Sequence, residues 1–386
     1  MNYDIVIVGG GMVGQAFALS MANTEYKIAI IEPNNSNPEL QADFHTRVSA
    51  ITPTSEKLLK TIGAWDLIKR KHAFSHTSVW DQNSHGTLDF HAQDEGLDHL
   101  GHIIENNAIQ SALFKALEKT RVEFINATLN SIAKTSTGYQ AQLENHDTLA
   151  CQLLIGADGA RSRVRDLADI EFSENNYQQK AIVCNIKAPQ EFKNTTWQRF
   201  LSDSIIALLP LGDNQASIVW SAENALAEEL MQLSKEDFAK RLSAGVEYRF
   251  GEFEVISDIQ AFPLIERSAK DYVQENLALI GDAAHNIHPL AGQGVNLGFS
   301  DVIELSEQLN AKLKPLGDYS VLRKYARARR RDNELMAKTM TGLNWIYKEN
   351  NEPLRWLRGF GMNVINDSPT LKSFLQKHAL GYSSNE

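Results

Sequence analysis

The sequence predicts an α/β fold that carries an inserted, mostly antiparallel sheet and ends in a helical segment. An apolar, β-branched run at residues 5–8 enters a glycine cluster, helical periodicity follows at 12–23, and a second strand-like run covers 27–32. Together these form a β-α-β unit of about 30 residues. Strand-like runs separated by turn signals fill residues 177–265. After Asn296 the pattern is helical almost to the end.

The remaining elements follow from the same patterns. We expect helices at residues 55–68, 107–119 and 234–244. We expect strands at residues 122–126, 137–143, 153–155, 181–186, 197–201, 204–209, 215–220 and 277–280. The predicted organisation is a discontinuous first domain at 1–70, 101–176 and 266–330, a second domain at 71–100 and 177–265, and a C-terminal helical segment at 331–386.

The composition excludes several classes of protein. The 386 residues carry 38 basic and 48 acidic side chains, a net charge of −10, which argues against nucleic acid as a partner. Two cysteines, Cys151 and Cys184, rule out a disulfide framework and fit a reducing compartment. No apolar run approaches the roughly 20 residues that span a bilayer. Because the N-terminus also lacks a basic leader, we expect a cytoplasmic protein.

The glycine cluster after the first strand has the spacing of a phosphate-binding turn. Its candidate ligand-binding residues are Gly9, Gly11, Met12, Val13 and Gly14. Gly9 permits the tight turn, Gly11 lets the backbone approach a pyrophosphate, and Gly14 allows close helix-strand packing. Glu32 ends the next strand, where a carboxylate accepts from an adenosine ribose hydroxyl. The alternative is a tight turn without a ligand.

A second glycine-rich region follows the strand at 277–280. Asp282 follows this strand after one glycine, where an acid can accept from a hydroxyl of a ribityl chain. The next stretch offers backbone N–H groups at a helix start, which suit a flavin ring edge and its phosphates. Its candidate residues are Gly292, Gln293, Gly294, Val295 and Asn296. Two such turns in one chain indicate one extended cofactor held at two places, and FAD fits best.

The motifs resemble those of FAD-dependent aromatic hydroxylases of the p-hydroxybenzoate hydroxylase type, and within them the ubiquinone-biosynthesis group named UbiH/UbiF/UbiI/VisC. The resemblance rests on the first glycine turn, on residues 156–165 and on residues 281–301. It implies a Rossmann-like FAD-binding domain with an inserted substrate domain. It also implies cofactor contacts from Arg47, Asp158 and Gly159. Asn106 and Gln110 are implied contacts too, in a segment where relatives often have arginine.

The resemblance also implies the reaction. Reduced FAD would react with O2, and a flavin hydroperoxide would hydroxylate the ring of a polyprenylated phenol or quinol in ubiquinone biosynthesis. NAD(P)H or another electron donor would reduce the flavin. The alternatives are a related hydroxylase of small soluble aromatics and a catalytically silent flavoprotein scaffold in a biosynthetic complex. A halogenase motif is missing, and the two cysteines do not form the redox pair of a disulfide reductase.

His288 and Pro289 are the candidate catalytic residues, with the flavin carrying the chemistry. The family has histidine or asparagine before this proline, so His288 is predicted to position or deprotonate the substrate phenol. A packing role is the alternative. His285 and His288 have a spacing that could fit one metal ion, but no third ligand follows closely and Pro289 interrupts the helix. We therefore predict no metal.

Two features near the C-terminus suggest surface contacts. The basic residues Arg327, Arg329, Arg330 and Arg331 are expected on a charged outer helix face, or against anionic lipid or a partner protein. An apolar set is expected in the core or an oligomer contact; it comprises Trp345, Ile346, Leu354, Trp356, Leu357, Phe360 and Met362. Because the inferred substrate has a polyprenyl tail, we also expect peripheral association with the inner face of the membrane or with a biosynthetic complex.

Overall fold

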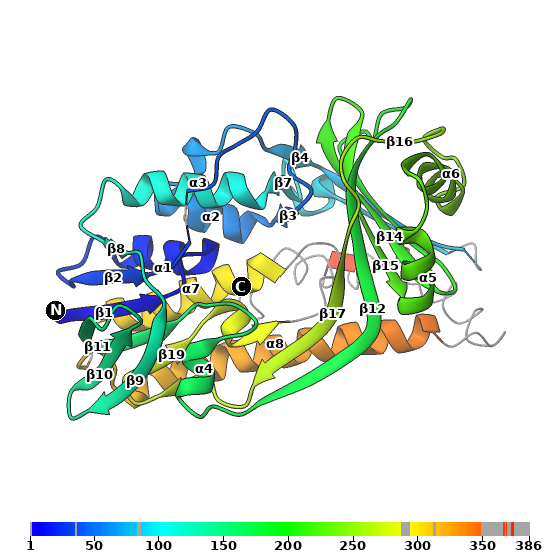
Figure 1. The fold of residues 1–386 in the computed structure, drawn as a ribbon. Coiled ribbons are helices and arrows are strands. Elements are labelled where there is room, and N and C mark those ends of the chain that lie inside the picture. Colours follow the sequence, from blue (N-terminus) through cyan, green and yellow to red (C-terminus); the bar gives the residue numbers. More distant parts are fainter. Residues whose placement is uncertain are drawn as a thin grey trace.

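The computed structural model describes residues 2–34, 37–82, 86–286, 294–311 and 314–348, together with 366, 368, 372 and 373. For residues 334–348 the description is limited to the backbone. Figure 1 shows two sheets at opposite ends of the molecule, joined by long strands and by a long helix along one side. This arrangement confirms the predicted α/β fold with an inserted, mostly antiparallel sheet.

The first sheet is built around the N-terminal strand. Its strands run in the order β18-β19-β11-β1-β2-β8, and β10 and β9 extend it from β11. The central pairings are parallel, with Ile5 opposite both Ile28 and Leu153. The bounds are β1 Asn2–Val8, β2 Ile28–Ile31, β8 Glu123–Ile125, β9 Leu129–Thr135, β10 Gly138–Leu143, β11 Thr148–Gly156, β18 Val273–Gln274 and β19 Leu277–Leu279. Apolar residues fill both faces of β1 and β2, as expected for buried parallel strands.

Helices pack on this sheet and on one another. Helix α1 contacts both α3 and α7, and α7 contacts α8. Figure 1 shows α8 continuing from the first sheet toward the second. The bounds are α1 Met12–Met21, α2 Pro53–Thr61, α3 Asn106–Leu117, α4 Arg163–Leu167, α7 Gly294–Asn310 and α8 Tyr319–Lys348, with short 3-10 turns η1 Trp65–Leu67, η2 Ala92–Glu95 and η3 Gly281–Ala283. Because α8 is continuous, it crosses the predicted boundary between residues 330 and 331.

The second sheet is mostly antiparallel and has its own apolar core. Its order is β20-β17-β12-β15-β14-β13-β5-β6, and β16 pairs with β12. Trp220 and Phe238 pack in this core, where α6 covers the sheet. The bounds are β5 His76–Asp81, β6 Thr87–His91, β12 Phe172–Lys187, β13 Thr195–Phe200, β14 Ser204–Gly212, β15 Gln215–Glu223, β16 Glu254–Val255, β17 Gln260–Ala269, β20 His285–Asn286, α5 Asn224–Met231 and α6 Lys235–Gly245.

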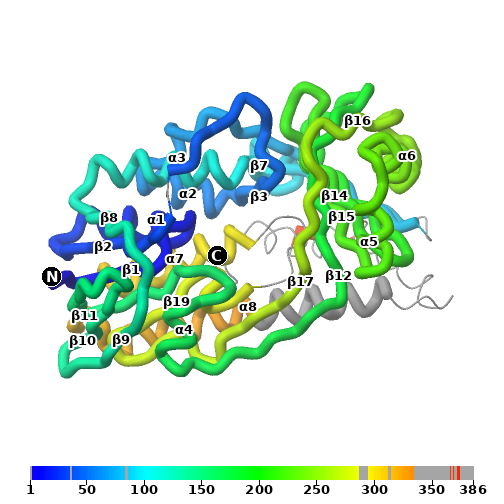
Figure 2. Tube along the Cα trace, in the orientation of Figure 1, coloured from blue at the N-terminus to red at the C-terminus, as the bar shows by residue number. Residues whose placement is uncertain are grey.

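A third, small sheet lies between the two larger ones. It comprises β3 Val48–Ile51, β7 Gly101–Glu105 and β4 His72–Phe74, in the order β3-β7-β4. The tube in Figure 2 follows β12 and β17 as they run side by side from the first sheet to the second. The sequence predicted only residues 181–186 of the 16-residue strand β12, because its first half is polar and exposed. The sequence also predicted one helix over residues 55–68, where α2 and η1 stand separately.

Candidate functional site

The first glycine turn is held by contacts between backbone atoms. Gly9 has a φ of +109°, and a Cβ added there would lie 2.3 Å from the carbonyl oxygen of Ala157. A Cβ on Gly14 would lie 2.0 Å from the carbonyl oxygen of Gly9. At Gly11, by contrast, no atom of the described residues would come within 4 Å of an added Cβ. The turn is therefore closed at Gly9 and Gly14 and open at Gly11, where a pyrophosphate would approach.

The residues around this turn leave the start of α1 open. Gly11 is the N-cap, and no described side chain caps the helix. Its first N–H groups are therefore available to an anion. Glu32 lies at the end of β2 as predicted, and its carboxylate accepts from the Gly10 N–H at 2.8 Å and from the Asn34 N–H at 2.9 Å. Glu32 thus fixes the turn itself, a role that the sequence did not predict.

The carboxylate of Asp158 caps a helix. It accepts from the N–H groups of Arg163 at 2.7 Å and Val164 at 3.0 Å, at the start of α4. The Ser162 hydroxyl donates to its other oxygen at 2.5 Å. Burial raises the pKa of the Asp158 carboxyl, and these hydrogen bonds oppose that rise. Gly159 follows with a φ of +82° and open space around it. The described side-chain contacts of Asp158 are structural, and the backbone of Ala157 and Asp158 closes on Gly9.

Helix α3 and the segment that leads into the small sheet carry three further candidates. Gln110 donates to the Gly10 carbonyl at 3.4 Å, and Asn106 accepts from the Ser49 hydroxyl at 2.7 Å. Arg47 directly precedes β3, and its guanidinium lies 5.5 Å from the ring centre of Phe262 on β17. Through this contact, Arg47 links the segment before β3 to the second sheet.

The second glycine turn packs directly against the first. Gly281 has a φ of +60°, and a Cβ added there would lie 3.2 Å from the side chain of Val13. A Cβ on Gly298 would lie 2.5 Å from the same side chain. The side chain of Val13, in the first turn, therefore packs against Gly281 and Gly298 of the second region. We call residues 9–14, 281–286 and 294–298 together the cradle.

Asp282 carries the charge of the second turn. Solvent reaches the side chain. Many protein atoms nevertheless surround the carboxyl, and the resulting loss of hydration raises its pKa. Nearby positive charge on His285 and Arg47 opposes the rise. Asn286 donates to the carboxylate at 3.2 Å. An accessible carboxylate with few donors suits a hydroxyl-bearing ligand.

Asn296 connects the start of α7 to the small sheet. Its amide donates to the Ala50 carbonyl at 2.7 Å, and its side-chain oxygen accepts from the Thr52 N–H at 3.2 Å. The backbone of Gly294 and Val295 lies in the same first turn of α7. The side chain of Asn296 is therefore committed to the protein, which leaves the backbone of this helix start as the candidate for contact with a ligand. His288, Pro289, Gly292 and Gln293 lie outside the described residues.

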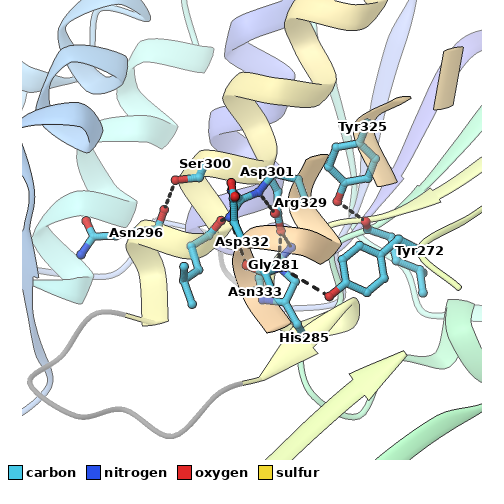
Figure 3. Close-up of polar contacts among 12 residues, drawn as sticks. Tyr272, Gly281, His285, Asn296, Ser300, Asp301, Tyr325, Arg329, Asp332 and Asn333 are labelled. Carbon is cyan, nitrogen blue, oxygen red and sulfur yellow. Dashed lines mark hydrogen bonds and ion pairs between the residues drawn. The ribbon is translucent and has the colours of Figure 1, made fainter. Parts of the chain in front are cut away.

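A buried network of charges holds the second turn in place, and the sequence did not predict it (Figure 3). Asp301 on α7 is fully buried; its carboxylate accepts from the Gly281 N–H at 2.8 Å and lies 2.6 Å from His285 Nε2. Arg329 on α8 donates to the other carboxylate oxygen at 2.8 Å. Burial alone would raise the pKa of Asp301, but His285 and Arg329 more than offset it, so the pKa is lowered.

The position of Arg329 corrects one expectation. Arg327 and Arg331 are exposed, as predicted for an outer helix face, but Arg329 is buried. Its guanidinium also donates to Asp332 at 3.0 Å and to Asn333 at 3.2 Å. Burial disfavours its charge, yet Asp301 raises its pKa overall. Of the four arginines in this run, Arg329 therefore faces the protein interior, where it contacts the carboxylate that holds the second turn.

The apolar C-terminal residues from Trp345 to Met362 lie outside the side chains that the structure describes. Two described residues beyond that set contact β6 and η2. Asn366 accepts from the Asp89 N–H at 3.2 Å, and Lys372 lies 3.1 Å from Asp94. Within the described ranges, no helix is long and apolar enough to cross a bilayer.

Comparison with solved structures identifies the fold. The chain superposes on p-nitrophenol 4-monooxygenase PnpA from Pseudomonas putida DLL-E4 with a TM-score of 0.79, at 19% identity and 99% coverage of both chains. It also matches OxyS anhydrotetracycline hydroxylase from Streptomyces rimosus with a TM-score of 0.73, at 20% identity, over 99% of this chain and 77% of the other. At these identities the likeness shows that the chain shares the fold of these two proteins.

Sequence comparison gives the family. The family described as FAD binding domain matches residues 2–339. The 3-demethoxyubiquinol 3-hydroxylase of Escherichia coli (strain K12) is 35% identical over 390 residues, or 98% of both chains. The mitochondrial ubiquinone biosynthesis monooxygenase COQ6 of Homo sapiens is 34% identical over 98% of this chain and 92% of its own, and the ubiquinone hydroxylase UbiL of Rhodospirillum rubrum is 31% identical over 98% and 89%.

The chain therefore belongs to the FAD-binding-domain family, in the branch of ubiquinone-biosynthesis hydroxylases. This confirms the family, the FAD cofactor and the enzyme class that the motifs indicated. The cradle fits FAD: the space at Gly11 and the uncapped start of α1 suit its pyrophosphate, and accessible Asp282 suits its ribityl hydroxyls.

Proposed function

We propose that this chain hydroxylates the aromatic ring of a polyprenylated phenol or quinol in ubiquinone biosynthesis, with FAD as cofactor and O2 as co-substrate. The observation that carries the proposal is the match over 98% of both chains to an enzyme named for ubiquinol hydroxylation. The cradle supports it, because the second turn packs against the Val13 side chain of the first, so that the two turns suit adjacent parts of one extended cofactor.

In this proposal, each part of the cradle has one task. The turn at residues 9–14 and the start of α1 bind the pyrophosphate, and Glu32 orders the turn and faces the adenosine ribose. Asp282 accepts from the ribityl chain, and Arg47 contributes positive charge beside it. The backbone at residues 294–296 lies at the start of α7, where N–H groups stabilise negative charge on the ring. Bound FAD supplies the redox chemistry, which is reduction by NAD(P)H or another donor and activation of O2.

The remaining predicted roles stay part of the proposal. Gln110 joins α3 to the first turn, and Asn106 joins it to β3. Asp158 and Gly159 shape the segment that closes on Gly9. The residues at 71–100 and 177–265 form the part that holds the substrate ring. His288, beside Pro289, positions or deprotonates the phenol, and a His288→Ala variant that forms product at the normal rate would contradict this role.

Membrane contact is a further part of the proposal, because a polyprenyl tail partitions into lipid. The C-terminal segment carries the apolar residues that could lie on a bilayer surface. Flotation with vesicles should retain the full-length protein and lose a variant truncated after residue 348. Equal flotation of both proteins would contradict this assignment.

The function is tested in a strain that lacks this protein. The proposal expects ubiquinone to fall and one prenylated ring intermediate to accumulate, with recovery when the normal gene is returned. A Gly11→Ala gene serves as the matched variant, because it should fold yet bind FAD weakly. Normal ubiquinone with no accumulating intermediate would contradict the proposal. A scaffold role would show instead as rescue by a variant that consumes no O2 in the presence of a reductant and a phenolic substrate.

A further inference from the structure

A cluster of metal-binding side chains lies apart from the cradle, on the small sheet and α2. Glu56 lies on α2, His102 on β7, and His99 just before β7. Strand β3 leads into α2 and pairs with β7, so that Ile51 lies opposite His102. The first turn of α2 therefore returns over β7 and brings Glu56 to the two histidines.

The spacing of the three side chains matches a shared ion. His102 Nδ1 lies 3.1 Å from Glu56 Oε2, and His99 Nε2 lies 3.5 Å from the same oxygen. All three ligand atoms lie within 4.8 Å of one another. A tetrahedral zinc ion with bonds of about 2.0 Å holds its ligand atoms about 3.3 Å apart. The two distances from Glu56 Oε2 are close to this separation, and the two histidine nitrogens lie within 4.8 Å of each other.

Two of the ligand atoms are buried without a hydrogen-bond partner. Within the described part of the chain, Glu56 Oε2 and His102 Nδ1 are shielded from solvent and lie 3.1 Å apart, but neither has a hydrogen bond of good geometry. The Glu56 side chain is 8% exposed. An unsatisfied buried carboxylate oxygen is costly, and a cation between the two atoms would satisfy both. Two ligands of one ion direct their lone pairs at the ion rather than at each other, which fits their poor hydrogen-bond alignment.

The surrounding charges leave one side of Glu56 free for an ion. Lys60 binds the other carboxylate oxygen, Oε1, at 2.6 Å, and Lys71 donates to the Ile68 carbonyl at 2.7 Å. His99 is 26% exposed, which gives an ion a route from solvent.

We propose that Glu56, His99 and His102 bind one Zn²⁺ ion, with water completing the coordination. Two imidazoles and one carboxylate form a ligand set that suits zinc. The ion would tie α2 to β7, whose last residue, Glu105, holds the segment before Arg47 through the His45 N–H. The site lies outside the cradle, and we assign it a stabilising rather than a catalytic role. His99 and His102 lie 43 and 46 positions after Glu56, so no short motif marks the complete ligand set.

The test is zinc binding by the full-length, FAD-loaded protein after treatment with a chelator. Titration with Zn²⁺ alone should show one ion per chain and a rise in the thermal midpoint. Removing one ligand in His99→Ala or Glu56→Gln should weaken binding at least about tenfold and abolish the rise. Substituting Co²⁺ should give the visible absorption of a tetrahedral site in the normal protein only.

His76→Ala is the matched control. The exposed fraction of His76, 23%, is close to the 26% of His99. His76 also lies beside a carboxylate, at 3.1 Å from Asp89. This variant should bind zinc as the normal protein does. The flavin content of each variant reports whether it has folded. If Glu56→Gln does not fold, the result for His99→Ala decides the test. Absence of zinc binding by the normal protein, or equal affinity in folded His99→Ala, would overturn the proposal.

Discussion

The two glycine turns of the cradle are fixed by different means. In the first turn, neighbouring backbone atoms leave no room for a Cβ at Gly9 or Gly14. In the second, a buried carboxylate on α7 holds the Gly281 N–H and is itself held by Arg329 on α8. The first turn therefore depends on local steric fit, and the second depends on charges brought together from distant segments. This difference predicts that the two turns respond differently to substitution and to pH.

The largest effect is expected at the buried charge. Asp301→Asn leaves Arg329 buried without its main counter-charge, which costs about 3–5 kcal/mol of stability. The thermal midpoint, followed by circular dichroism, should fall by at least about 5 °C. Asp332→Asn is the control, because Asp332 contacts the same guanidinium but is 45% exposed and should cost less than about 1 kcal/mol. Equal losses in the two variants would mean that the network does not hold the turn.

The next effect separates Gly9 from Gly11. Gly9→Ala forces a side chain into a left-handed backbone conformation and against the Ala157 carbonyl, at a cost of at least about 1–3 kcal/mol. Gly11→Ala meets no described atom, so the stability of the FAD-free protein should change by less than about 0.5 kcal/mol. Thermal unfolding of both FAD-free variants checks this. An equal loss in both would show that Gly11 is also needed for the fold.

The smallest effect is expected at Asp282, and its sign is opposite to that at Asp301. The pKa of Asp282 is raised on folding, so ionisation costs stability as the pH rises from about 3.8 through the raised pKa. FAD-free Asp282→Asn should thus equal or exceed the normal protein at pH 7, by less than about 1 kcal/mol because solvent reaches the side chain. Its advantage should disappear below about pH 3.8. A loss of stability at pH 7 would contradict this assignment.

The pH dependence at Asp301 runs the other way. The pKa of Asp301 is lowered on folding, so its contribution is present above the unfolded value of about 3.8 and is lost as the pH falls through the folded pKa. The stability gap between the normal protein and Asp301→Asn should therefore be constant near neutrality and close below about pH 3.8. A gap that persisted at the lowest pH would show that it arises from altered packing rather than from charge.

The sequence predicted what local geometry determines. The glycine spacing, the β-branched strand before it and the acid at the end of β2 predicted the first β-α-β unit, because each lies within about 30 residues of the others. Glu32 and Asp282 both lie where strand ends were expected. The polar half of β12 was missed because its exposed residues lack an apolar pattern.

The sequence did not predict what distant segments bring together. Asp301 and Arg329 are 28 positions apart on different helices, and the surrounding basic run looks like a solvated face. Glu56 and the two histidines likewise meet only because β3 pairs with β7. Pairing of this kind depends on tertiary packing, which hydrophobic periodicity in one segment does not report.

The most direct test of the account is the affinity of the folded protein for FAD, measured by quenching of flavin fluorescence. If both turns hold one cofactor, Gly11→Ala and Asp282→Asn should each weaken FAD binding at least about tenfold, which is about 1.4 kcal/mol. Both FAD-free variants should keep the thermal midpoint of the normal protein or exceed it slightly. Normal FAD affinity in either folded variant would contradict the claim that the two turns form one cradle.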